Sequence, residues 1–123
     1  MKIAPPEFEK LVADGLTMIP EELRAHIDNV QIVIEDAPND ELLEELGVPT
    51  DETLFGLYEG TPLTERTSQY SAFPDRIVIF RKPLLEAFDD PRDIRREVAR
   101  TVIHELAHHF GIDDERLVNL GWD

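Results

Sequence analysis

The segment from His104 to His108, which reads HELAH, constrains the fold of this chain more than any other part of the sequence. Its two histidines are four residues apart, and positions i and i+4 lie side by side on an α-helix. The segment therefore predicts a helix that carries two neighbouring imidazoles, with the carboxylate of Glu105 beside them.

The flanking residues support this helix. Asp90 is a favourable N-cap, Pro91 suits the first helical position, Asp93 adds an acid to the first turn, and Gly111 is a typical stop. At 100° per residue the helix has two faces. The apolar face contains Ala99, Val102, Ile103, Leu106 and Phe110, and the opposite face contains Glu97, Thr101, His104 and His108.

The pattern HExxH is the zinc-hydrolase signature. His104 and His108 are predicted to bind one Zn²⁺, which lowers the pKa of a bound water to about 7. Glu105 is the predicted general base that takes the proton from this water as it attacks a carbonyl group.

A catalytic zinc site usually has three protein ligands, and the residues after the motif supply candidates. The longer segment reads HExxHxxGxxD and resembles the metzincin clan of zinc peptidases, in which a glycine breaks the helix and the side chain three residues later returns to the metal. That position is Asp114 here, because Gly111 stands at the glycine of the pattern. Asp113 and Glu115 remain alternatives for the third ligand.

Two segments give a closer resemblance: residues 54–66, LFGLYEGTPLTER, and residues 101–111, TVIHELAHHFG. They look like the small bacterial zincin-like proteins, the minimal zincins, from about Val30 onward. The resemblance implies a zinc metallopeptidase-like fold and site. Two departures from the larger clan are the lack of a methionine after the motif and the presence of only nine residues after Asp114, which leaves no room for a lower cleft wall.

The pattern of the whole chain predicts one α+β domain, residues 1–123, with a zincin-like fold in which a small twisted mixed sheet packs on the metal-binding helix. Helices are expected over residues 7–18 and 40–46, and a short one from residue 20. Strands are expected over residues 30–34, 53–58 and 76–80. Residues 60–74 are expected to form an irregular connection that borders the cleft.

The composition of the chain limits the classes of molecule that it is expected to bind. A net charge of −15, from 27 acidic and 12 basic residues, argues against binding to nucleic acids or anionic membranes. No cysteine is present, so disulfide bonds and thiolate ligands are excluded. The N-terminus lacks the apolar core of a secretion signal and no apolar segment is long enough to span a bilayer, so a cytoplasmic location is expected.

The leading hypothesis is a zinc metallopeptidase that acts on an extended peptide or protein segment. In zincins the strand beside the cleft pairs with the substrate, and residues 54–58 are the candidate here. The alternatives are a zinc-binding interaction or regulatory domain without turnover, and a hydrolase of non-peptide amides or esters. Tyr58 and Tyr70 are candidate oxyanion donors, although packing roles are favoured for both. His109 is expected near the site but not on the metal, and His26 at the surface.

Overall fold

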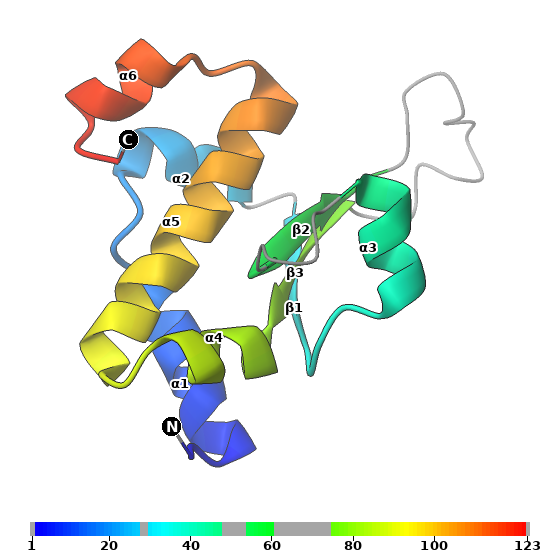
Figure 1. The fold of residues 1–123 in the computed structure, drawn as a ribbon. Coiled ribbons are helices and arrows are strands. Elements are labelled where there is room, and N and C mark those ends of the chain that lie inside the picture. The colour runs from blue at the N-terminus through cyan, green and yellow to red at the C-terminus, as the bar shows by residue number, and fades with distance from the viewer. Residues whose placement is uncertain (1, 28–29, 48–53, 61–74, 123) are drawn as a thin grey trace.

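The structure, a computed structural model, describes residues 2–27, 30–47, 54–60 and 75–122 of the chain. Within these ranges the elements follow one another in the order labelled in Figure 1: α1 (Pro5–Leu16), α2 (Glu21–Ile27), β1 (Val30–Glu35), α3 (Asp40–Leu46), β2 (Gly56–Glu59), β3 (Asp75–Phe80), α4 (Arg81–Ala87), α5 (Pro91–Phe110) and α6 (Asp114–Asn119). The helices and the small sheet confirm the predicted α+β class.

The described strands form a mixed sheet in the order β1-β3-β2. β3 pairs in parallel with β1 and antiparallel with β2, with Tyr58 opposite Ile77. Because β3 has a neighbour on each side, its last four residues, from Ile77 to Phe80, are buried. β2 has β3 as its one neighbour among the described strands, and it lies on the side of the sheet near α5 (Figure 1).

Helix α5 has the ends that the sequence predicts. The Asp90 carboxylate accepts a hydrogen bond from the backbone N–H of Arg92, and Gly111 ends the helix in the left-handed region at φ 71°. The apolar face is buried against α1, α4 and the sheet, and it contains Ile94, Val98, Ala99, Val102, Ile103, Leu106 and Ala107. Phe110 departs from the prediction, because it is 43% exposed in the last turn, where its ring stacks on His26 of α2.

Other elements agree with the sequence to different degrees. β1 and α3 are confirmed, and Gly47 ends α3 at φ 68°. The predicted strand over residues 53–58 is observed as β2, with residue 53 outside the described ranges. No element is predicted from the sequence over α4, whose third residue is Pro83; proline is tolerated in a first turn, where the N–H groups have no helical partner.

The predicted connection over residues 60–74 lies almost wholly outside the described residues. Helices in the described ranges lack the combination of length and apolar character needed to cross a bilayer.

Candidate metal centre and its surroundings

Close packing of α5 on β2 places the motif beside the edge of the sheet. A Cβ atom built on Gly56 would lie 2.6 Å from Cγ2 of Thr101 and 2.9 Å from the carbonyl oxygen of Val78. Both distances are below any real Cβ contact, so only glycine allows this approach. Thr101, Glu105 and His109 follow one another at intervals of four residues, so they form one stripe along α5 that faces β2.

His104 supplies the feature that most resembles a metal ligand. Its Nε2 atom is buried and, in the described structure, has no hydrogen-bond partner. Leaving a buried polar atom unpaired costs roughly 1–3 kcal/mol, so such atoms are rare and call for an explanation. His108, one turn later, is exposed and leaves its imidazole accessible from solvent.

Glu105 lies between these histidines and β2. The backbone amide of Tyr58 lies near the Glu105 carboxylate and favours its charged form. Burial raises the pKa of the Glu105 carboxyl above its usual value, and this effect outweighs the lowering by His108, by the Tyr58 amide and by His104. A raised pKa brings a carboxylate closer to the range in which a general base works at neutral pH.

The Tyr58 side chain is held from two sides. Its hydroxyl donates a 2.6 Å hydrogen bond to Oδ2 of Asp75, and its ring stacks on His109 with centroids 4.0 Å apart and planes inclined by 17°. Nε2 of His109 lies 3.7 Å from the same Asp75 oxygen. The Tyr58 hydroxyl therefore donates to Asp75, as expected for the packing role. Tyr70, the other candidate donor, lies outside the described residues.

Aromatic rings continue beyond His109 across the end of α5. His109 meets Phe110 edge-on at 5.0 Å, and Phe110 stacks on His26 at 4.3 Å. The sequence gives His26 a surface position, but this contact leaves it half-buried. His109 agrees with its prediction, since it neighbours the motif and contacts an acid.

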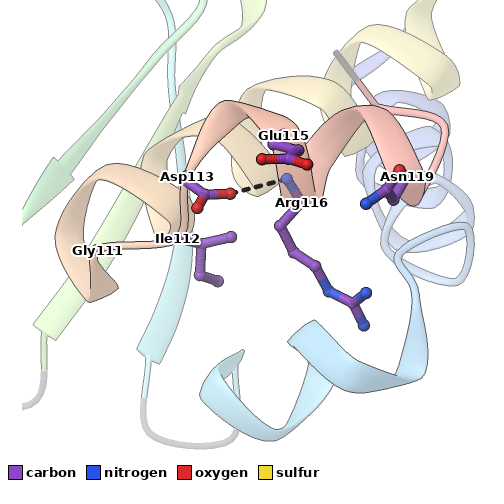
Figure 2. Close-up of a pocket in the computed structure, with 6 residues that line it drawn as sticks. All are labelled: Gly111, Ile112, Asp113, Glu115, Arg116 and Asn119. Carbon is purple, nitrogen blue, oxygen red and sulfur yellow. Dashed lines mark hydrogen bonds between the residues drawn. The ribbon is translucent and has the colours of Figure 1, made fainter.

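The segment after Gly111 places the three candidate acids apart from the buried histidine nitrogen. Asp113 is the N-cap of α6, and its Oδ1 accepts a 2.8 Å hydrogen bond from the Arg116 amide (Figure 2). Asp114 and Glu115 lie in the exposed first turn of α6. An open pocket of about 420 Å³ borders this turn and is lined by Gly111, Ile112, Asp113, Glu115, Arg116 and Asn119.

Across the described ranges, no three His, Cys, Asp or Glu side chains are grouped so as to hold a metal ion. The structure therefore does not bring Asp114, Asp113 or Glu115 together with His104 and His108. The histidine pair still fits zinc, because imidazole nitrogen is a usual zinc ligand and the buried Nε2 of His104 has no hydrogen-bond partner among the described residues. The choice of third ligand stays a prediction.

Two features of the site were not predicted from the sequence. Asp75 was not singled out, and neither was the contact of the Tyr58 amide with Glu105. Tyr58 and Asp75 are 17 residues apart, and their meeting depends on the register of β2 on β3. This register cannot be predicted from any local pattern in the sequence.

Comparison with known proteins supports the fold and the family. A solved structure of a conserved hypothetical protein from Thermus thermophilus has a TM-score of 0.58 and 22% identity, with 88% of this chain and 94% of that chain covered. This likeness concerns the fold. No curated protein matches the chain.

Residues 27–122 match the profile described as zincin-like metallopeptidase. Because the match covers most of the chain and includes the whole HExxH helix, the chain belongs to the zincin-like metallopeptidase family.

Proposed function

We propose that this protein is a zinc-dependent hydrolase that cleaves peptide bonds in extended protein segments. The observation that carries the proposal is the buried Nε2 of His104, which has no partner within the described ranges, together with the raised pKa of the neighbouring Glu105 carboxyl. His104, His108 and Asp114 would hold the ion. When bound, zinc supplies the Lewis acidity that polarises a carbonyl group and makes water easier to deprotonate.

Glu105 acts as the general base. An oxygen of its carboxylate accepts a proton from the attacking water and then returns it to the nitrogen of the leaving amine. Its raised pKa favours this exchange, because a base whose pKa is nearer the working pH also gives up the proton more readily.

The edge of β2 is the proposed docking strand for the substrate. Antiparallel strands alternate between residues that bond their partner and residues that face away from it. The Phe80 amide donates to the Phe55 carbonyl, so this alternation turns the main-chain groups of Gly56 away from β3. An extended peptide can pair with such outward groups. The acidic chain favours neutral or cationic segments in the cytoplasm, and nucleic acids and membranes are not proposed as partners.

A second candidate is a zinc-binding interaction domain that binds a partner without turnover. It is favoured by the exposed position of Asp114, which leaves two histidines without a third ligand nearby among the described residues.

The two candidates are separated by zinc content and peptide-library cleavage in the wild type and in Glu105→Gln. The hydrolase proposal expects both proteins to bind one zinc ion and the variant to lose roughly 10²- to 10⁴-fold in kcat/KM. Glu86→Gln, a matched change on the exposed face of α4, should keep full activity. Cleavage by Glu105→Gln at the wild-type rate would refute the hydrolase role, and zinc binding without any cleavage by the wild type would favour the interaction domain.

A further inference from the structure

Tyr58 contacts α5 at two points that are one helical turn apart. Its backbone amide lies near the carboxylate of Glu105, and its ring stacks on His109. Since residues at i and i+4 share one helix face, these two contacts fix both the position of the last turns of α5 over β2 and the direction of the Glu105 side chain.

Tyr58 is itself held by the sheet. Asp75, the first residue of β3, accepts the hydrogen bond from its hydroxyl at 2.6 Å. The Asp75 side chain is 13% exposed, so water competes weakly for this bond. His109 stacks on one face of the Tyr58 ring, and Nε2 of His109 lies 3.7 Å from Oδ2 of Asp75. Strand β2, strand β3 and helix α5 thus meet at this one ring.

Gly56 makes this arrangement possible. It lies two residues before Tyr58 on the same face of β2, where the absence of a side chain lets Thr101 come close. A bulkier residue would hold α5 away from β2 and separate the Tyr58 amide from Glu105.

From these contacts we propose that Tyr58 is the positioning residue for Glu105, and that Asp75 and His109 fix Tyr58 for this task. The catalytic part of this inference rests on the proposed function, because it takes Glu105 as the general base. The structural part stands without it, since the contact between Tyr58 and Glu105 belongs to the protein without metal.

The structural part is tested by NMR on the full 123-residue chain without added metal. The amide proton of Tyr58 lies near a carboxylate, so Glu105→Ala should move its resonance upfield, toward the value of an amide bonded to water. Asp75→Ala should move the same resonance in the same direction, because the ring loses its anchor. Asp75→Asn keeps an acceptor for the hydroxyl and should restore most of the wild-type shift.

Arg76→Gln is the matched control. It removes the 2.6 Å ion pair to Glu59, which also joins β2 to β3 but does not touch α5, so the Tyr58 resonance should stay in place. The proposal would be overturned if the chemical shift of the Tyr58 amide proton stayed at its wild-type value in Glu105→Ala or in Asp75→Ala. If Tyr58→Phe fails to fold, the Asp75 variants provide the same test.

The catalytic part predicts a separate signature. Tyr58→Phe and Asp75→Ala should lower kcat by roughly 10- to 100-fold, the range for a misplaced catalytic group, with KM and zinc content close to wild type. A fall in thermal stability with unchanged kcat would show a purely structural role and overturn the positioning proposal. If the wild type cleaves nothing while the Tyr58 resonance still follows Glu105, the proposed function fails and the positioning contact stands.

Discussion

The two halves of the predicted zinc site differ in what holds them in place. His104 and His108 lie on the 20-residue helix α5, whose other face is fixed by the core. Asp114 lies in the first turn of the six-residue helix α6, where its side chain is exposed. The core therefore holds the histidines in place without metal, whereas the proposal of Asp114 as third ligand requires binding energy to bring this acid to the ion.

The same contrast runs across α5 itself. Leu106 and Ile103 are fully buried and apolar, while His104 places a buried nitrogen beside them that has no partner in the part of the chain that the structure describes. The protein without metal thus carries a local cost at the position where it is otherwise best packed. This arrangement is expected where binding of a ligand, rather than folding, satisfies the group.

The largest expected effect is the loss of zinc from His104→Ala. Removing a ligand should weaken zinc binding by more than the roughly 10- to 100-fold that follows loss of an outer partner. Competition with a chromogenic chelator measures this. His26→Ala, which removes a histidine stacked on Phe110, should bind zinc like the wild type. If His104→Ala and His26→Ala lose zinc affinity equally, the histidines of the motif are not special zinc ligands.

The next effect sharpens the contrast within α5. Leu106→Ala should lower the free energy of unfolding by about 2–5 kcal/mol, because it empties space in a closely packed core. His104→Leu should instead leave the metal-free protein as stable as the wild type or more stable, since it removes the unpaired nitrogen. Urea unfolding of both variants without metal decides this, and strong destabilisation by His104→Leu would contradict the account of the site.

A smaller effect tests the acidic half of the site. Asp114→Ala should weaken zinc binding, but by less than His104→Ala, because part of the binding energy is spent in moving the acid. Asp113→Asn keeps an equally good N-cap and should bind zinc normally, as should Glu115→Gln. If one of these two variants shows the loss in place of Asp114→Ala, that residue is the ligand.

The smallest expected effect concerns Glu97, on the same side of α5 as His104. Burial raises the pKa of the Glu97 carboxyl, against the lowering by Arg100, His104 and Arg96. The folded protein then holds this proton more tightly than the unfolded chain, so stability falls as pH rises from the ordinary pKa to the raised one. Glu97→Gln should melt above the wild type at pH 7, and the gap should close below about pH 4.

Thermal melts across this pH range provide the measurement. Glu86→Gln, an exposed change on α4, should leave the pH dependence as it is in the wild type. A constant gap between Glu97→Gln and the wild type at every pH would show that the Glu97 charge plays no part in stability.

How far the sequence predicts this molecule depends on the range of the interaction. Asp90, Pro91 and Gly111 give the bounds of α5 correctly, because caps act within one or two turns. Tertiary packing decides the exposure of Phe110, which periodicity alone assigns to the core. α4 has no counterpart among the predicted elements, because seven residues with a proline in the first turn carry little helical periodicity.

Within the candidate site, too, local features are predicted from the sequence and long-range contacts are not. His104, Glu105 and His108 follow from helical spacing, and the structure places them on α5 as expected. The contact of Tyr58 with Asp75 and Glu105 depends on strand register, which no local pattern records. The placement of Asp114 depends on the turn at Gly111 and on the start of α6, which puts its side chain in an exposed first turn.

The central claim is that one zinc ion is held by the two histidines of α5. A crystal structure of the chain grown with equimolar zinc, with anomalous data at the zinc edge, tests it most directly. We expect one strong peak about 2.0–2.1 Å from Nε2 of His104 and from an imidazole nitrogen of His108, with a carboxylate oxygen from the segment after Gly111 as a third ligand. A zinc peak elsewhere on the molecule, with the Nε2 atom of His104 still unpaired, would contradict it.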